Sequence, residues 1–394
     1  MRSVLWGSPL PPTRSGVADY AAEVLPVLAA QAGVRILRPP GWTPPGGGAG
    51  WLEGAELVPA DAPAEASIPL LHLGNNPFHL WIARRLRASG GIVVLHDTVM
   101  HHLLVEEAAA DGAWGRFAAD LKDAHGGAGA AIAEARAWGY QGRLDPFLFP
   151  ARKAYLRHAR GVVVHNRRAL RDVEADCPGL PVRRVPLAVA RLAGGDRKAW
   201  RERLGLGGEL LLVHLGFLTP AKGLDTILRA AAALARIGVA VRLLVVGEGA
   251  QEGRFRERAA EAGLGRIVRV WGYASQEDLG GILSAADLGL VPRYPTAGET
   301  SAAVLRFFAA GCPVAVSGYA QFLELPEAAA LPLPPGEGGA AELVRIVGRL
   351  AADPAALHDA RRAAYAAWED GGHDPRTAGR ALLAAVKELD GDVA

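Results

Sequence analysis

The sequence predicts an α/β protein made of two doubly wound domains with parallel sheets. Half of the 394 residues are hydrophobic, 21% are charged and the mean hydropathy is +0.14, which excludes a disordered chain. Short β-branched or leucine-rich runs alternate with longer helical patterns, which is typical of parallel sheets. At roughly 150 residues per domain, the length allows two to three domains.

The strand-like runs form two series, separated by 188–196, which has two glycines and no strand pattern. We therefore place the domain boundary near residue 190, which gives domains at 1–190 and 191–375. The runs of the first series are 3–7, 34–37, 69–73, 91–95, 161–165 and 182–186. Those of the second are 209–216, 239–247, 266–271, 287–292, 313–317 and 330–333.

Two helical segments complete the predicted first domain. Residues 103–159 are Ala-rich and read as a helical insertion, broken at Gly126-Gly127 and again around 139–150. The tail 376–394 contains one more helix, which we expect to pack back on the first domain. The Pro- and Gly-rich stretch 39–50 predicts a surface loop.

Charge and cysteine content narrow the function classes. The formal net charge of +2 is too balanced for a protein that neutralises a nucleic-acid backbone, so no nucleic-acid partner is expected. Cys177 and Cys312 lie far apart and match no metal or redox spacing. No leader or membrane-spanning stretch is recognisable, which predicts a cytoplasmic protein with at most peripheral contact to the inner membrane face.

Ligands of doubly wound sheets bind at the carboxyl ends of the strands, so the loops that follow strands are the candidate sites. After the first strand, Ser15 can cap a helix that begins at Gly16, where N–H groups could bind a phosphate or a sugar hydroxyl. Asp19 lies in its first turn. Asn75 and Asn76 follow a later strand and suit a polyol, although Asn-Asn-Pro is also a common turn signal.

Two titratable residues, His96 and Asp97, directly follow a buried apolar strand, which packing alone does not explain. With His101 and His102 they could instead form a metal site, because Asp97 and His101 are four residues apart. His102 would point elsewhere and no second ligand pair appears, so no metal site is predicted. Asp390-Gly391-Asp392 mimics a metal motif but lies in the last five residues, where fraying is expected.

In the second domain, Lys222 stands at a helix start, where a cation is unfavourable unless an anion sits nearby. This indicates a phosphate ligand, although an exposed loop lysine would look the same. The strand that follows ends in Gly247-Glu248-Gly249, which resembles a dinucleotide motif. The next strand ends in Gly272-Tyr273 with no acidic residue for a ribose, which disfavours an NAD(P) oxidoreductase.

Glu299 precedes a helix capped by Thr300 or Ser301. A carboxylate in this position can hold sugar hydroxyls while the free backbone N–H groups bind a diphosphate.

The whole order of motifs resembles the retaining glycosyltransferases of family 4, which have the GT-B fold of two facing Rossmann-like domains. The resemblance spans nearly the full chain. It is carried by Ser15–Tyr20, Val94–Asp97, Gly216 with Lys222-Gly223, Gly247–Gly249, Gly272-Tyr273 and Ala310–Val314.

The sequence departs from the family pattern in two places. The family commonly has Arg shortly before its phosphate-binding Lys, where this chain has Phe217. The family's E-x7-E pair is incomplete: its second position is Arg306, and its first falls on Gly298 or, shifted by one residue, on Glu299. The usual contact to the nucleotide ribose is therefore altered, while a subset of the family shares the Gly-Glu-Thr-Ser sequence.

The resemblance implies a cytosolic, metal-independent hexosyltransferase that moves a sugar from a nucleoside-diphosphate sugar to a hydroxyl acceptor with retention, in glycan, glycolipid or natural-product biosynthesis. It implies no cofactor besides the donor. The alternatives are an inert GT-B binding subunit and an NAD(P)-dependent oxidoreductase. The implied catalytic residues are His96 and Glu299, the donor-binding residues Gly16, Lys222, Gly247, Tyr273, Thr300, Ser301 and Arg306, and the acceptor residues Asp19, Asn75, Asn76 and Asp97.

Overall fold

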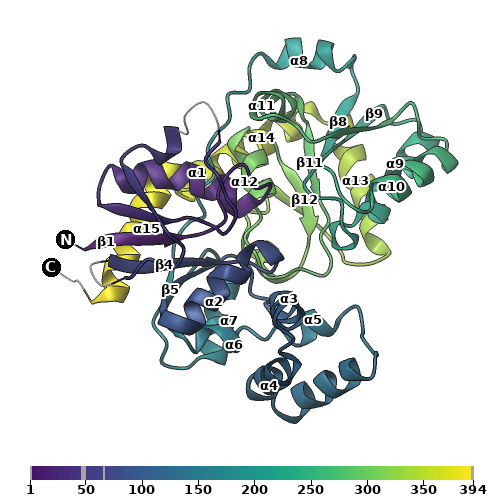
Figure 1. Cartoon of the computed structure of the whole chain (residues 1–394). Coiled ribbons are helices and arrows are strands. Elements are labelled where there is room, and N and C mark those ends of the chain that lie inside the picture. The colour runs from purple at the N-terminus through teal and green to yellow at the C-terminus, as the bar shows by residue number, and fades with distance from the viewer. Residues whose placement is uncertain (1, 46–49, 65–66, 392–394) are drawn as a thin grey trace. The chain divides into compact units, whose positions relative to one another are not determined.

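The computed structural model of the chain describes residues 2–45, 50–64 and 67–391, and it divides into two compact units (Figure 1). Unit 1 comprises Met1–Ala188, Ala297–Thr300 and Pro375–Ala394, and unit 2 comprises Val189–Thr296 and Ser301–Asp374. Each unit is a wholly parallel sheet with helices, which confirms the predicted fold class.

The sheet of unit 1 has seven strands in the order β3-β2-β1-β4-β5-β6-β7. The chain switches direction at β1, whose Leu5 pairs with Arg35 on one side and Pro69 on the other. Such a switch point is where ligands of parallel sheets bind. The strands are β1 (Ser3–Gly7), β2 (Val34–Leu37), β3 (Ala55–Val58), β4 (Ser67–Leu73), β5 (Gly91–Leu95), β6 (Ala159–Val164) and β7 (Val182–Arg184).

Burial explains which strands were recognisable. Every residue of β4 and β5 is buried, so both strands are continuous apolar runs. The sequence does not predict β3, because this four-residue edge strand buries only Val58 and contains Glu56 in its middle. Of the predicted loop 39–50, residues 46–49 lie outside the described part of the chain.

The helical insertion lies between β5 and β6, and its longest helix is interrupted at Gly126, whose φ is 62°. Short 3-10 turns occupy Gly50–Leu52 and Pro77–His79. The helices of unit 1 are α1 (Gly16–Ala29), α2 (Leu80–Ser89), α3 (His101–Asp111), α4 (Trp114–Ala137), α5 (Asp145–Leu148), α6 (Lys153–Leu156), α7 (Arg167–Asp176) and α15 (Pro375–Asp390).

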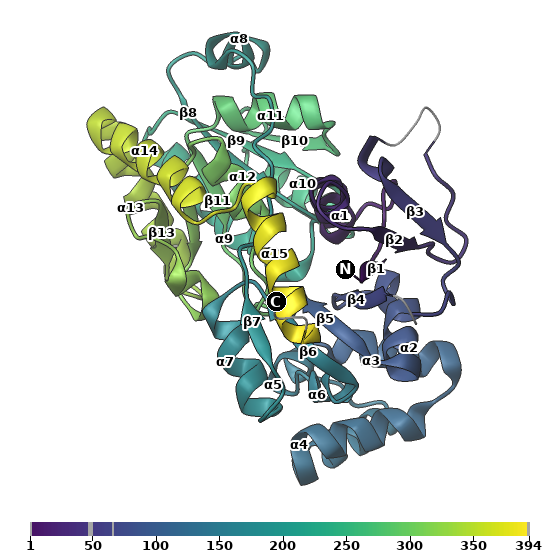
Figure 2. The same ribbon diagram turned by 90° about the vertical axis from the view of Figure 1, so that its left-hand side faces the viewer.

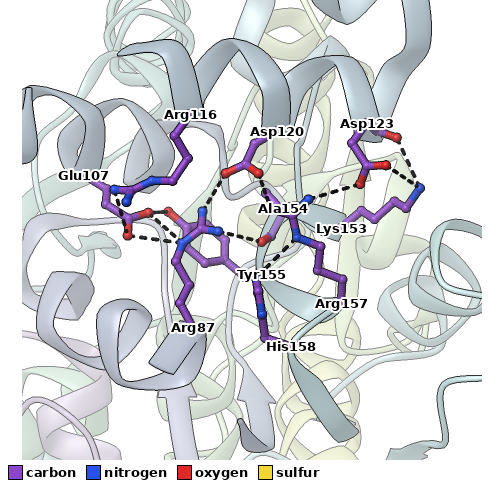
Figure 3. Close-up of polar contacts among 10 residues, drawn as sticks. All are labelled: Arg87, Glu107, Arg116, Asp120, Asp123, Lys153, Ala154, Tyr155, Arg157 and His158. Carbon is purple, nitrogen blue, oxygen red and sulfur yellow. Dashed lines mark hydrogen bonds and ion pairs between the residues drawn. The ribbon is translucent and has the colours of Figure 1, made fainter. Parts of the chain in front are cut away.

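A buried ion cluster joins the insertion to α2 (Figure 3). Arg87 on α2 donates to Glu107 of α3 at 3.2 Å and to Asp120 of α4 at 2.7 Å. Both carboxylate side chains are only 1% exposed. Tyr155 of α6 donates its hydroxyl to the same Glu107 at 3.0 Å, and Arg157 pairs with Asp120. One guanidinium therefore connects four helices.

The last helix, α15, packs against α1 and β6 of unit 1 (Figures 1 and 2). A Cβ atom on Gly161 of β6 would lie 2.9 Å from a methyl carbon of Leu389, so glycine there lets α15 pack closely on the strand. Asp390 forms an ion pair with Arg2 at 2.7 Å and its side chain is 2% exposed. The expectation that Asp390 frays is therefore wrong, while Asp392 lies outside the described residues.

The sheet of unit 2 has the order β10-β9-β8-β11-β12-β13, with 3-10 turns at Pro220–Lys222 and Ala320–Glu324. Its strands are β8 (Leu210–Leu215), β9 (Val241–Val246), β10 (Val268–Gly272), β11 (Leu288–Val291), β12 (Val314–Ser317) and β13 (Ala330–Leu333). Its helices are α8 (Arg197–Arg203), α9 (Leu224–Arg236), α10 (Glu252–Glu261), α11 (Gln276–Ala285), α12 (Ala302–Ala309), α13 (Gly338–Ala352) and α14 (Pro354–Asp370). Within 2–45, 50–64 and 67–391, no helix is long and apolar enough to cross a membrane.

Candidate active site

In unit 1 the predicted site residues gather at the carboxyl ends of β1, β4 and β5, which are neighbours in the sheet. Ser15 caps α1 by accepting the N–H of Val17 at 3.3 Å. Gly16, the first residue of α1, is exposed, and a Cβ atom there would meet nothing within 4 Å. Asp19 is exposed in the first turn of the same helix. This helix end is therefore open to a ligand of unit 1.

Asn75 and Asp97 lie together at the ends of β4 and β5. The backbone N–H of Asn75 donates to Asp97 Oδ2 at 2.8 Å, and its side-chain oxygen accepts the N–H of Leu103 at 3.0 Å. Asn76 instead caps the following 3-10 turn by accepting the N–H of Phe78 at 3.0 Å. The turn signal in Asn-Asn-Pro is thus observed at Asn76, whereas Asn75 binds Asp97 through its backbone N–H.

His96 belongs to a buried group of aromatic rings. Its Nε2 lies 3.0 Å from Nδ1 of His72 on β4. The ring of Tyr20 lies 5.2 Å from that of His96 and the ring of His165 5.3 Å. Burial holds the pKa of His96 well below its usual range, and the neighbouring histidines lower it further. His96 is therefore neutral near pH 7.

The contacts of His72 fix which nitrogen of His96 carries the proton. His72 Nε2 is buried and has no hydrogen-bond partner among the described residues. We infer that this nitrogen is unprotonated, because a buried N–H without an acceptor is costly. Nδ1–H of His72 then donates to His96 Nε2, and the proton of His96 resides on Nδ1. A sequence reading misses His72 because it lies within a strand.

The residues of the alternative metal site, Asp97, His101 and His102, are engaged in other contacts. Asp97 Oδ2 accepts the N–H of Asn75, and His101 Nδ1 donates to the carbonyl of Phe149 at 2.8 Å. His102 Nδ1 faces the Asn75 amide at 2.7 Å. Over the described ranges, no three His, Cys, Asp or Glu side chains are grouped to hold a metal ion.

The segment Ala297–Thr300, which carries Glu299, belongs to unit 1 rather than to the second domain in which its sequence position puts it. The N–H of Thr98, after β5, donates to the carbonyl of Ala297 at 2.8 Å. Asn166, after β6, donates its amide to the carbonyl of Gly298 at 2.9 Å and to Thr300 Oγ1 at 3.0 Å. Thr98 and Asn166 thereby position the residues on both sides of Glu299.

Neither positioning residue was predicted. A Cβ atom on Gly298, whose φ is 78°, would lie 1.9 Å from Thr98 Oγ1, so this close approach requires glycine. The Asn166 side-chain oxygen also caps α7 by accepting the N–H of Ala169 at 2.7 Å. In the sequence Asn166 has the signature of an ordinary helix cap, which conceals its second contact.

In unit 2, Lys222 and Gly247 lie at the carboxyl ends of the neighbouring strands β8 and β9. The Lys222 ammonium is 4.0 Å from where a Cβ atom of Gly216 would be. At Gly247, whose φ is 135°, a Cβ atom would lie 2.1 Å from the carbonyl oxygen of Gly216. Glycine at 247 therefore lets the two loops pack closely beside the lysine.

Arg293, which follows β11, adds a buried cation near Lys222. The pKa of His214 on β8 is lowered to about 4, chiefly by burial and in smaller part by these two cations. The loop of Arg293 is tied to that of Lys222 by a hydrogen bond from the N–H of Tyr294 to the carbonyl of Ala221 at 2.8 Å. Arg293 was not predicted, because it is one arginine among many in this chain.

The remaining predicted donor residues of unit 2 belong to the end of β10 and to α12. Tyr273 follows β10 and is 59% exposed, so its ring can stack on a flat ligand. Ser301 caps α12 by accepting the N–H of Val304 at 3.4 Å. Arg306 on the same helix donates Nη1 to the carbonyl of Ala190 at 2.5 Å, which ties it to the linker.

Part of unit 2 is similar to a known protein family. Residues 209–353 match the family described as glycosyl transferases group 1. The chain is 37% identical over 130 residues to glycogen synthase of Rhodopseudomonas palustris, covering 32% of this chain and 26% of that protein. It is 28% identical over 218 residues to 2-deoxystreptamine glucosyltransferase of Streptomyces kanamyceticus, covering 53% and 56%. The chain thus spans from a quarter to about half the length of these curated relatives.

Solved structures match the whole chain in fold. Sucrose-phosphate synthase of Thermosynechococcus elongatus has a TM-score of 0.66 at 17% identity and covers 99% of each chain. The glycosyltransferase WaaG, involved in lipopolysaccharide biosynthesis, has a TM-score of 0.62 at 16% identity and covers 99% of this chain and 100% of its own. Identity this low shows the fold alone. The match to group 1 glycosyltransferases is therefore a property of residues 209–353 in unit 2, and the two parallel-sheet units have the GT-B fold.

Proposed function

We propose that the chain transfers a sugar from a nucleoside-diphosphate sugar to a hydroxyl acceptor with retention at the anomeric carbon. The observation that carries this proposal is the cationic end of unit 2, where Lys222 lies beside the close-packed glycines 216 and 247, and Lys222 and buried Arg293 both act on His214. All of these positions lie within the segment that matches the family. Two neighbouring cations suit a diphosphate.

Structural neighbours support the nature of the donor. HepE of Anabaena, with a TM-score of 0.63 and 15% identity, was solved with UDP. In unit 2 of this chain, the diphosphate would contact Lys222 and Arg293, and the base would stack on Tyr273. In unit 1, the helix end at Gly16 would bind a phosphate or a sugar hydroxyl. Glu299 with Thr300 and Ser301 would hold the sugar.

In unit 1, His96 and the polar residues around it suit the reacting sugars. His96 Nδ1–H would donate a hydrogen bond to a reacting sugar and would not act as a base, because His72 occupies its Nε2. Asp19, Asn75, Asn76 and Asp97 would face the acceptor. The departing phosphate would assist deprotonation of the acceptor hydroxyl, so the proposal includes no general base.

The proposal includes no metal, because Lys222, Arg293 and helix N-termini would neutralise the leaving diphosphate. Saturating EDTA should therefore leave turnover nearly unchanged. Activity that collapses in EDTA and returns with Mg²⁺ or Mn²⁺ would overturn this part of the proposal.

The donor site is tested by titrating a panel of nucleoside diphosphates and nucleotide sugars by calorimetry. Lys222→Ala should weaken the best ligand by tenfold or more, since a charge-assisted phosphate contact contributes about 1.5 to 3 kcal/mol. Lys198→Ala removes an exposed cation on α8 and is the matched control, which should bind like the wild type. Unchanged affinity in Lys222→Ala would remove this lysine from the site. Binding without transfer would favour an inert subunit, and NAD(P) binding an oxidoreductase.

A further inference from the structure

The helical insertion contains an apolar hollow of about 820 Å³ that the donor site does not use. The two halves of α4, separated at Gly126, contribute its walls. Trp114 and Phe117 come from the first half, and the second half contributes small side chains such as Ala130 and Ala133. Trp114 is 46% exposed, so the hollow opens to solvent. A hollow of this size and composition is typical of a site for a small apolar ligand.

A second, polar hollow of about 490 Å³ adjoins the first, because Arg136 and Gln141 line both. Its other lining residues include His102, Glu106 and Arg143. The two hollows form one surface that changes from polar to apolar along its length.

The polar end of this surface reaches the expected acceptor residues. His102 Nδ1 lies 2.7 Å from the amide nitrogen of Asn75, whose backbone N–H binds Asp97. The contacts therefore lead from Asn75 through the polar hollow to the apolar one, all within unit 1.

Arg136 stands where the two hollows meet. Its guanidinium lies 6.0 Å from the centre of the Trp114 ring and 5.9 Å from that of Phe117. In the described part of the chain it has no carboxylate at ion-pair distance, and Arg143 has none either. Glu106 and Glu134 also line the hollows, but neither pairs with Arg136. A cation held on two rings at this junction is complementary to an anionic group.

We infer that the acceptor is an anionic amphiphile. Its hydroxyl lies near Asn75 and Asp97, its anionic group lies at Arg136, and its apolar group fills the hollow between the halves of α4. This inference rests on the proposed function only in calling the ligand the acceptor, because binding to the hollows does not require sugar transfer.

Three probes, titrated by calorimetry, separate the parts of this ligand. The two probes with an alkyl chain are kept below their critical micelle concentrations. Decyl phosphoglycerol has a diol, a phosphodiester and an alkyl chain in the proposed order, glycerol 1-phosphate has no chain, and 1-O-decylglycerol has no charge. We expect decyl phosphoglycerol to bind at least tenfold more tightly than either of the others. Equal affinity for glycerol 1-phosphate, or binding only above the micelle concentration, would overturn the inference.

Two variants locate the bound probe. Ala130→Trp fills the apolar hollow and should abolish the advantage of the decyl chain, whereas Ala131→Trp, on the exposed neighbouring position, should not. Arg136→Gln should weaken decyl phosphoglycerol about tenfold and leave 1-O-decylglycerol unchanged. Circular dichroism checks that each variant is folded.

The remaining outcomes also decide the inference. If sedimentation shows a dimer that Ala130→Trp dissociates, a second copy of the chain covers the hollow and the inference is wrong. If decyl phosphoglycerol fails to bind while nucleotide binding still depends on Lys222, this inference is wrong and the proposed function is unaffected. If decyl phosphoglycerol binds while no nucleotide does, the hollow is a ligand site and the proposed function is wrong.

Discussion

Nδ1 of His72 and Nε2 of His96 lie 3.0 Å apart and share a hydrogen bond, between two rings that burial keeps neutral. The bond turns the remaining N–H of His96 away from β4. His96 is thereby prepared to donate to an oxygen and is unable to accept a proton at Nε2. This pair makes the end of β5 a fixed hydrogen-bond donor over a wide pH range.

Buried neutral histidines predict that acid destabilises the protein. Burial lowers the pKa of His79 in unit 1 and of His214 in unit 2 to about 4, against about 6.5 in an unfolded chain. Below pH 6.5 the unfolded state binds more protons, so this stability is complete above pH 6.5 and is lost as the pH falls toward 4. Each group should cost about 1.4 kcal/mol per pH unit in that window. Urea unfolding midpoints at pH 7.5, 6.5 and 5.5 measure the loss.

His214→Asn is the control for this pH dependence. The asparagine amide can still donate to the carbonyl of Leu290, which now accepts from His214 Nδ1 at 3.0 Å, but it does not titrate. As the pH falls from 6.5 toward 4, the free energy of unfolding of this variant should therefore decrease by about 1.4 kcal/mol per pH unit less than that of the wild type. Midpoints that stay constant from pH 7.5 to 5.5 in the wild type would contradict the prediction.

Glu299→Gln should lower turnover about a hundredfold or more, with a smaller change in donor affinity. The substitution preserves shape but removes the charge that would orient the sugar in the transition state. Steady-state kinetics with the donor found by calorimetry measure the effect. Near-wild-type turnover would show that the role assigned to Glu299 belongs to another residue.

Asn166→Asp should lower kcat while leaving α7 intact. A carboxylate still accepts the N–H of Ala169, but it cannot donate to Gly298 and Thr300. We expect a fall in kcat of about tenfold, consistent with the loss of a positioning contact of about 1.4 kcal/mol. The donor KM should change less, and the unfolding midpoint should stay close to that of the wild type.

Asn166→Ala removes the helix cap as well as the two donated bonds, and should cost about 1 kcal/mol of stability in addition. If Asn166→Asp keeps full kcat, these bonds do not position Glu299. If both variants lose stability equally, Asn166 acts through the fold and not through the segment 297–300.

Arg87→Met should destabilise unit 1 by about 3 to 5 kcal/mol, because it leaves the buried carboxylates of Glu107 and Asp120 without their shared partner (Figure 3). Arg116→Met is the matched control. Arg116 is 41% exposed and reaches Glu107 only at 3.5 Å, so its loss should cost less than about 1 kcal/mol. Urea denaturation compares the two, and equal effects would contradict a central role for Arg87.

The sequence allowed prediction of the fold and indicated candidate site residues, but it did not indicate the contacts that position them. Strands such as β4 and β5 were recognisable because burial on both faces makes them continuous apolar runs. His96 stood out as a titratable residue directly after such a run. His72 lies inside a strand and Asn166 resembles a simple cap, so their roles depend on which loops the sheet order brings together. That order is set by long-range packing, which local pattern does not record.

Unit 1 is assembled from distant parts of the chain. Its first 188 residues emerge from the ribosome well before α15, and until then the surface of β6 at Gly161 and the flank of α1 lack their covering helix. The main segments of unit 2 end at Asp374, before α15 begins. The nascent polypeptide can therefore complete its second half first, and the N-terminal half matures only when the final helix is synthesised.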